Sequence, residues 1–290
     1  MKSKSLLGLA IGSSSVKLLE LSKLDHRYCL EHYAVIPIEQ SITAAIEDAL
    51  IISGTKIRTA AIALPDTDII SKILPFNTAT LSPDDIEEKI ITDIHHYIHY
   101  PLNEICFDFD VINPDSVLLI VARTAQVNAQ IALANQAGLM ITIVDIHSHA
   151  LERASTFMTD ISGNITALID VGKNNITTMV LDNKKIIFSR SEPLNTLDAS
   201  LIHVERAFHF FSASEKDKKI THILLMGGGS YAPKLCTSLE NQFSLPVSIA
   251  NPFVDMVIAK HIDPLTLSHD ARLLMTACGL ALRSFEHESN

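Results

Sequence analysis

The sequence predicts an α/β protein made of two related domains, the first of which carries an inserted α+β subdomain. An apolar strand, a polar turn and a returning apolar strand occur at residues 6–21 and again at residues 167–181. A repeated unit of this kind indicates two related domains. Short strands and helices at residues 57–138 form the insertion. The predicted domains are residues 1–162 and 163–290, with a terminal helix at about residues 270–286.

The composition is that of a globular protein with a sizeable core. The chain has 290 residues, of which 47% are hydrophobic and 19% are charged. This balance excludes a disordered or fibrous protein. A chain of this length buries roughly 75% of its unfolded surface. The net charge of −10 and the lack of a dense Lys/Arg stripe argue against a nucleic acid partner.

Cysteine spacing and the N-terminal residues indicate the compartment. The four cysteines lie far apart without a CxxC pair, so neither a zinc knuckle nor a disulfide framework is predicted. The apolar run at residues 6–11 is shorter than a signal peptide requires, and no A-x-A site follows it. No uncharged apolar span approaches the roughly 20 residues of a membrane helix. We therefore expect a cytoplasmic protein that reaches a membrane only through a partner.

The turn at residues 12–15 is the first candidate site. Gly12 is followed by Ser13, Ser14 and Ser15, and Lys17 lies on the returning strand. Glycine can take positive φ, and successive backbone N–H groups with three hydroxyls can surround an anionic group such as phosphate. A structural hairpin turn is the alternative interpretation, because Gly/Ser turns are common in hairpins.

Two later turns have similar properties. Asp170 ends the strand at residues 167–171, and Gly172 and Asn174 follow it in a polar turn. The third turn joins the strand at residues 223–226 to a helix and consists of Gly227, Gly228 and Gly229. Three glycines at such a turn let a flat ligand approach the backbone. A tight connection without a ligand is the alternative.

The remaining elements follow from hydrophobic periodicity and capping residues. Strands are expected at residues 28–36, 59–64, 69–74, 105–112, 117–122, 141–145, 185–190 and 246–251. Helices are expected at residues 42–53, 83–100, 124–137, 147–157, 201–211 and 231–242. The strongest helix start is Ser82, an N-cap that precedes a proline at the first helical position.

One pair of histidines has the spacing of metal ligands. His95 and His99 stand at i and i+4 on the helix expected at residues 83–100. Metal sites need three or four ligands, and the sequence offers no third ligand for this pair. A solvated helix face is therefore the favoured interpretation, and no metal is assigned.

The three turns, in this order, resemble the two phosphate loops and the adenosine loop of the actin-like ATPase superfamily. They read GLAIGSSSVK, LIDVGKNNITTMVL and ILLMGGGSYAPKL. A closer resemblance is to the PilM family of type IV pilus assembly proteins. It is carried by IGSSSVKLLELS, PLNEICFDFDVI, IVDIHSHALERA and GGGSYAPKLCTSLENQFSLPVSIANPF, which span nearly the whole chain.

The resemblance implies a fold and a role. It implies two actin-like (ribonuclease H-like) domains around a nucleotide cleft, as in FtsA, with residues 57–138 as the inserted subdomain. ATP and Mg²⁺ are the cofactors of the family. Family members are cytoplasmic and bind the N-terminal peptide of the inner-membrane protein PilN in a groove between the first domain's core and the insertion. Together they form a homo-oligomeric ring, held at the membrane through that partner.

Three departures from the family pattern concern the cleft. Ala10 stands where the family has an aspartate that holds Mg²⁺, and a methyl group cannot do so. His147 stands where the family usually has a glutamate beside the cleft. Asn195 and Thr196 replace a Gly-Gly pair, and a long helical segment that supplies base and ribose contacts is missing after them.

These departures favour an adaptor with a degenerate nucleotide site and no assigned catalytic residue. The retained turns leave room for weak nucleotide binding without efficient hydrolysis. An active ATPase whose metal is held by Asp170 alone is the alternative from the enzyme class. A sugar kinase is less favoured, because no extra acidic base stands beside the second loop. A third alternative is a scaffold similar to the cytoplasmic domain of the type II secretion L protein.

Overall fold

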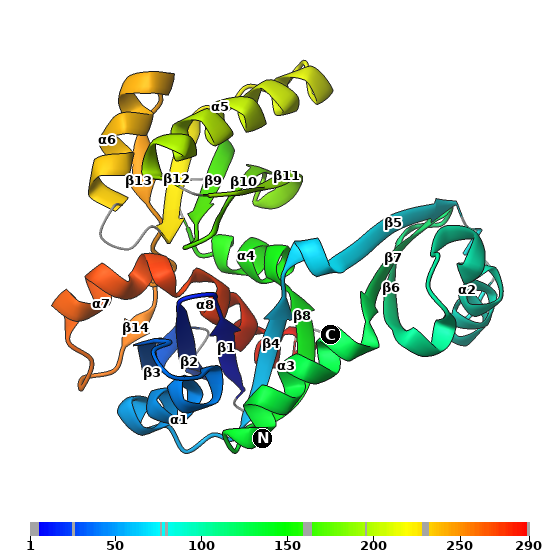
Figure 1. Cartoon of the computed structure of the whole chain (residues 1–290), viewed down its shortest axis with the longest axis horizontal. Coiled ribbons are helices and arrows are strands. Elements are labelled where there is room, and N and C mark those ends of the chain that lie inside the picture. Colours follow the sequence, from blue (N-terminus) through cyan, green and yellow to red (C-terminus); the bar gives the residue numbers. More distant parts are fainter. Residues whose placement is uncertain are drawn as a thin grey trace. The chain divides into compact units, whose positions relative to one another are not determined.

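A computed structural model describes residues 6–24, 27–75, 77–78, 81–158, 164–194, 196–227 and 232–288. The chain divides into two compact units. The larger unit consists of Met1–Ala63 and Ala134–Asn290, and the smaller unit consists of Leu64–Leu133. Figure 1 labels the helices and strands of both units. Within the described ranges, no helix is long and apolar enough to cross a membrane.

A six-stranded sheet, here called the first sheet, has the order β14-β3-β2-β1-β4-β8. Its strands are β1 Leu7–Ile11, β2 Ser15–Leu24, β3 Arg27–Pro37, β4 Thr59–Leu64, β8 Met140–Ile146 and β14 Val257–Ile258. β1, β2 and β3 form an antiparallel meander, and β4 is parallel to β1. Between β3 and β4, helix α1 (Ile42–Ser53) begins at the N-cap Ser41 and ends at Gly54, whose φ is 70°.

A five-stranded sheet, here called the second sheet, repeats this arrangement. Its order is β11-β10-β9-β12-β13. The strands are β9 Ile165–Val171, β10 Asn175–Asp182, β11 Lys185–Pro193, β12 His222–Gly227 and β13 Val247–Ile249. β9, β10 and β11 form the antiparallel meander, and β12 is parallel to β9. The repeated topology confirms the predicted α/β class with two related halves.

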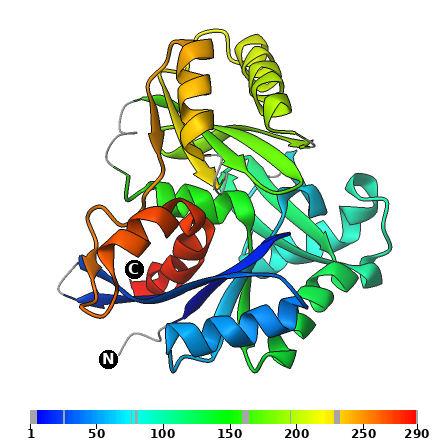
Figure 2. The ribbon, with the colours of Figure 1, turned by 60° about the vertical axis from the view of Figure 1, so that its left-hand side comes forward.

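The two faces of the second sheet have different neighbours, because successive strand residues point to opposite faces. Ala167 and Ile169 of β9 face helices α5 (Leu197–Ser214) and α6 (Ala232–Phe243), which contribute Val204 and Leu239 to this cluster. Both views show α5 and α6 side by side (Figure 1, Figure 2). Helix α5 begins four residues earlier than the predicted residue 201, because Thr196 caps it. Leu168 has the opposite orientation and faces the first sheet.

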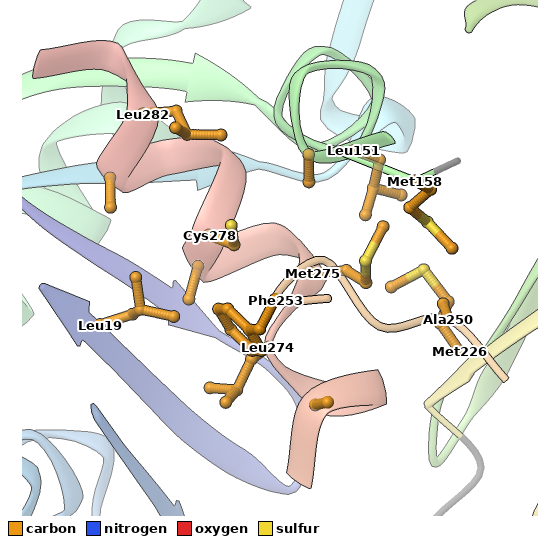
Figure 3. Packing of buried hydrophobic residues seen from close by; sticks show 14 of the residues in the cluster. Leu19, Leu151, Met158, Met226, Ala250, Phe253, Leu274, Met275, Cys278 and Leu282 are labelled. Carbon is orange, nitrogen blue, oxygen red and sulfur yellow. The ribbon is translucent and has the colours of Figure 1, made fainter. Parts of the chain in front are cut away.

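One apolar cluster joins the two sheets. It contains residues of both sheets, of helix α4 (His147–Ser155) and of the C-terminal segment. Figure 3 shows Leu19 of β2, Leu151 of α4 and Met226 of β12 around Phe253 and Met275. Burying such side chains contributes about 1.5–3 kcal/mol each, so this cluster is a major source of the stability of the larger unit.

The C-terminal segment returns to the first sheet. β14 pairs in parallel with β3, and the predicted single helix at residues 270–286 is wrong. The segment is instead divided into α7 Pro264–Asp270, η5 Ala271–Leu273, α8 Met275–Leu282 and η6 Arg283–Glu288. Asp263 caps α7 ahead of Pro264, so the helix starts earlier than predicted. The 3₁₀ turn η5 then separates it from α8.

Two glycines let α8 approach its neighbours at backbone distance. A Cβ atom at Gly8 of β1 would lie 1.9 Å from the Ala277 carbonyl oxygen of α8. A Cβ atom at Gly279 of α8 would lie 1.8 Å from the Ala150 carbonyl oxygen of α4. Helix α8 is therefore packed between β1 and α4, with no room for a side chain at either contact.

The smaller unit is a three-stranded antiparallel sheet with the order β5-β7-β6 and one long helix. Its elements are β5 Ile69–Pro75, α2 Pro83–Tyr97, β6 Ile105–Asn113 and β7 Ser116–Arg123. Ile86, Ile90 and Ile94 of α2 pack against the sheet. Ser82 and Asp85 form a capping box at the start of α2. Helix α3 (Thr124–Gln136) runs from this unit into the larger one.

Helix α2 ends at Tyr97, three residues before the predicted end. Ile98 is extended, with φ of −128°, and its side chain is buried. His99 therefore lies beyond the helix, and the expected i, i+4 arrangement with His95 is wrong. Among the described residues, no group of three or more His, Cys, Asp or Glu side chains is placed to hold a metal ion.

A charged cluster connects β11 to α5. The Glu192 carboxylate accepts hydrogen bonds from Arg190 Nε at 2.6 Å and Arg206 at 2.8 Å, and His203 Nδ1 lies 2.6 Å from it. Partial burial opposes the ionisation of Glu192, but the hydrogen bonds from Arg190 and His203 outweigh burial and lower its pKa below the ordinary 4.5. The ionised carboxylate therefore stabilises the folded state above the unfolded-state pKa.

Glu192→Gln is expected to lower the free energy of unfolding by about 1 kcal/mol at pH 7, because two arginines lose a charged acceptor and are partly screened by solvent. This contribution disappears as the pH falls through the lowered pKa, below 4.5. Urea unfolding at pH 7 and at acid pH measures both effects. Equal stability of the two proteins at pH 7 would contradict this account of the cluster.

Candidate functional site

The first candidate turn connects β1 to β2. The Gly12 N–H donates a hydrogen bond to the Ser15 carbonyl at 3.0 Å and closes the turn. Ser13 and Ser14 are exposed at its tip. Gly12 does not take the positive φ that the sequence allowed, since Gly54, Gly138 and Gly227 are the described glycines with positive φ. The turn is closed without left-handed backbone at Gly12.

Lys17 and Ala10 are neighbours on β2 and β1 and face the second sheet. They are partners in the β1–β2 register, and Ala10 belongs to the cluster between the sheets. Lys17 Nζ lies 3.5 Å from the Ser15 carbonyl oxygen, behind the turn. Burial lowers the pKa of Lys17, and the negative charge of Asp170 opposes this shift. Lys17 thus lies on the same face of the first sheet as Ala10.

Asp170 lies near the end of β9 on the face that points to the first sheet, because it alternates with Ile169 and Val171. Its Oδ2 atom is 3.3 Å from Nε2 of His147, the first residue of α4. Both side chains are about one-fifth exposed. The other ring nitrogen of His147, Nδ1, lies 3.4 Å from the Thr276 hydroxyl of α8. Asp170 of the second sheet therefore contacts His147, which directly follows β8 of the first sheet.

Gly227 ends β12 beside Asp170, and its backbone requires glycine. Its φ is 66°, and a Cβ atom there would lie 2.4 Å from the Val171 carbonyl oxygen and 2.9 Å from Asp170 Oδ1. The Gly227 carbonyl accepts a hydrogen bond from Arg272 Nε at 3.2 Å. The third candidate turn thus begins in direct contact with the end of β9.

The second turn is exposed and is held by its own backbone. The Gly172 N–H donates to the Asn175 carbonyl at 2.9 Å, and the Leu194 N–H donates to the Asn174 carbonyl at 2.8 Å. These contacts place Lys17 beside Gly12 and Asp170 beside Gly227, whereas Ser13, Ser14 and Asn174 stay at turn tips. Three predicted positions lie outside the described residues, namely Asn195, Gly228 and Gly229.

Two residues of this site were not predicted from the sequence. Thr276 contacts His147, and Arg272 contacts the Gly227 carbonyl. Both belong to the C-terminal segment, more than 40 positions from their partners in the chain. Thr276 carries the one hydroxyl of the apolar helix α8, which reads MTACGLAL. A hydroxyl in such a helix is a weak signal, because it can equally bond to its own helix backbone.

The smaller unit contains a pocket of about 260 Å³ at the edge formed by the start of β5, the start of β6 and the end of β7. Its floor is apolar and includes Ile70, Ile105 and Val121. Its polar lining residues are Thr67, Asp68, Tyr100, Arg123 and Gln126.

Arg123 and Tyr100 form a fixed pair at this pocket. The guanidinium carbon of Arg123 lies 4.3 Å from the centre of the Tyr100 ring, and Arg123 also donates a hydrogen bond to the Tyr100 hydroxyl. Cation–π contact and the hydrogen bond hold the charge at the pocket mouth. The pocket thus combines apolar side chains with a fixed positive charge.

Comparison with known proteins identifies the family. A family model described as type IV pilus assembly protein PilM matches residues 8–196 and 193–285. The two matched segments overlap at residues 193–196.

Solved structures agree on the fold. A chain of a PilM-PilN type IV pilus biogenesis complex has 19% sequence identity and a TM-score of 0.80, covering 98% of this chain and 99% of that chain. A Bacteroides thetaiotaomicron protein with an actin-like ATPase fold has 10% identity and a TM-score of 0.52, covering 87% and 92%. The third structure is the cytoplasmic domain of EpsL, an inner-membrane component of the type II secretion system of Vibrio cholerae. It has 9% sequence identity and a TM-score of 0.50, covering 93% of this chain and 94% of that chain.

These likenesses confirm the prediction of two actin-like domains. The family model covers nearly the whole chain, which confirms the resemblance found in the sequence. The chain belongs to the PilM family of type IV pilus assembly proteins.

Proposed function

We propose that this protein is a cytoplasmic adaptor of type IV pilus assembly that binds the N-terminal cytoplasmic peptide of a PilN-like inner-membrane protein. Membership of the PilM family and the likeness to a chain from a PilM-PilN complex support this proposal. The partner holds the adaptor at the inner membrane, where copies of it assemble into a ring. Peptide capture relies on apolar pockets and backbone hydrogen bonds and needs no chemical step.

The pocket of the smaller unit is the observation that carries the peptide-binding proposal. At about 260 Å³ it is smaller than the roughly 300–1,000 Å³ of a typical small-molecule site. Its floor suits an aliphatic side chain of the peptide. Arg123 and Gln126 supply hydrogen-bond donors for peptide carbonyls, and Asp68 supplies an acceptor for a peptide N–H.

The region around Ala10 and Asp170 is proposed to be a degenerate nucleotide site. Ala10 presents a methyl group, packed in the cluster between the sheets, at the position of the family's metal-holding aspartate. Asp170, the carboxylate that remains, is in contact with His147. Loss of metal anchoring removes transition-state stabilisation from phosphoryl transfer. Peptide binding is therefore expected to be the same with and without ATP.

Arg123→Glu is expected to weaken binding of the cognate PilN peptide at least tenfold, because a carboxylate replaces the donor at the pocket mouth. Ile70→Ala is expected to weaken binding by a smaller factor, since part of the apolar floor is lost. Fluorescence anisotropy with the labelled peptide measures both, in the presence and absence of ATP and Mg²⁺.

Lys89→Glu is the matched control, because Lys89 is an exposed cation of α2 outside the pocket. It is expected to bind like the wild type. Failure of the wild-type protein to bind the peptide under either condition would overturn the proposed function. Equal peptide affinity of Arg123→Glu and the wild type would show that the peptide does not bind in this pocket.

The active ATPase is the second candidate. Asp170 lies beside Gly227, and Lys17 lies on the face of the first sheet that also carries Ala10. These positions favour this candidate, because a cation, a carboxylate and an approachable backbone are parts of a phosphate site. Calorimetry with ATP and Mg²⁺ tests it directly. Absence of binding at millimolar nucleotide would exclude this candidate.

A further inference from the structure

The contacts of Asp170 define the chemistry of the cleft. The carboxylate belongs to β9 of the second sheet, Lys17 belongs to β2 of the first sheet, and His147 begins α4. His147 Nε2 lies 3.3 Å from Asp170 Oδ2, and Asp170 is the charged group that acts on the inward-facing Lys17. The carboxylate thus has one nitrogen donor in contact, and this donor comes from outside its own sheet.

Thr276 contacts the ring nitrogen of His147 that does not face Asp170. The Thr276 hydroxyl lies 3.4 Å from Nδ1 and can donate to it, which leaves the Nε2–H to point at Asp170. In this tautomer the ring offers Asp170 one N–H donor.

The remaining groups offer little to a divalent cation. Mg²⁺ requires near-octahedral oxygen coordination at about 2.0–2.1 Å. Ala10 gives no oxygen atom from its side chain. Asp170 Oδ2 faces the His147 ring, and no group of three or more His, Cys, Asp or Glu side chains gathers there among the described residues. The donor set does not fit Mg²⁺.

We infer that His147 takes the place of a divalent cation at Asp170, so that the link between the two sheets is independent of metal ions. This inference concerns the cleft and deepens the degenerate site proposed above. It does not rest on peptide binding. A cleft that binds Mg²⁺ would overturn it and leave the peptide proposal intact, whereas failure of peptide binding would leave it unaffected.

Thermal unfolding of the full chain in EDTA and in millimolar MgCl₂ or MnCl₂ tests the inference. The wild-type Tm is expected to be the same in all three solutions. His147→Glu places a second carboxylate against Asp170, so its Tm in EDTA is expected to fall by at least about 2 °C. Mg²⁺ or Mn²⁺ should restore that Tm, because the paired carboxylates form a new metal site.

Two further variants distinguish loss of the His147–Asp170 contact from a general destabilisation of α4. His147→Gln keeps a donor for Asp170 and should show a small loss of Tm without a response to metal. His149→Glu adds the same charge to the same helix two positions away and should also show no response to metal.

Three outcomes would overturn the inference. The first is a wild-type Tm that rises by more than about 2 °C with either ion. The second is an equal Tm in EDTA for His147→Glu and His147→Gln. The His147–Asp170 contact would then make no contribution to stability. The third is stoichiometric binding of Mn²⁺ to the wild-type protein in calorimetry, a result that stays decisive even if His147→Glu fails to fold.

Discussion

Gly279→Ala is expected to lower the free energy of unfolding by about 3 kcal/mol or more, one of the two largest effects we predict. The new Cβ atom would lie 1.8 Å from the Ala150 carbonyl oxygen and 2.5 Å from the carbonyl carbon. These are backbone atoms of α4, and no side-chain rotation can relieve the overlap. Either α8 or α4 must shift, and the cluster between the sheets must repack.

Urea unfolding of the purified variant and of Gly54→Ala measures this effect against a matched control. Gly54 has φ of 70°, and a Cβ atom added there would have no neighbouring atom within 4 Å. Gly54→Ala is therefore expected to lower the free energy of unfolding by about 1 kcal/mol, because alanine is strained in left-handed backbone and meets no overlap there. Gly8→Ala, on the opposite contact of α8, should resemble Gly279→Ala. Equal losses at Gly279 and Gly54 would show that α8 can move away from α4 at little cost.

Gly227→Ala is expected to have the other large effect, again about 3 kcal/mol or more, because strain and overlap add at this position. The φ of 66° disfavours alanine, and its Cβ atom would lie 2.4 Å from the Val171 carbonyl oxygen. The two residues are partners in the parallel pairing of β12 with β9. The variant must therefore open the end of the second sheet.

Gly138→Ala is the control for this variant. Gly138 has φ of 80° and open space around it, so alanine there tests left-handed backbone without overlap. Urea unfolding should give a smaller loss for Gly138→Ala. Because the overlap at Gly227 also involves Asp170 Oδ1, at 2.9 Å, the variant is also expected to disturb the Asp170–His147 contact. A loss at Gly227 no larger than at Gly138 would contradict the close packing described here.

Local patterns predicted most elements of the fold. The hairpin expected at residues 6–21 is formed by β1 and β2, and Ser82 caps α2 as its sequence context indicated. Alternating polarity and capping residues act over a few positions, so a single sequence is enough to detect them. Helix α2 nevertheless ends early, because burial of Ile98 in an extended conformation outweighs the continued helical pattern.

The candidate site was predicted in part. Lys17 and Asp170 were selected by turn chemistry, and the structure places both on inward faces of their sheets. A role of Ser13, Ser14 and Asn174 in contacting nucleotide stays a prediction, as does a domain boundary near residue 163. The pocket beside Arg123 was not predicted, because it is assembled from the ends of three strands that are far apart in the sequence.

By itself, the sequence determined the two strand–turn–strand units, the α/β class and the family, since these depend on short motifs and on the order of elements along the chain. The tertiary structure alone decided that the C-terminal segment returns to the first sheet, that Thr276 meets His147 and that His147 meets Asp170. The physical reason is that such contacts join residues many positions apart. Their geometry depends on how closely backbones pack, as α8 does against β1 at Gly8 and against α4 at Gly279. The distance between two packed elements cannot be predicted from a local sequence pattern.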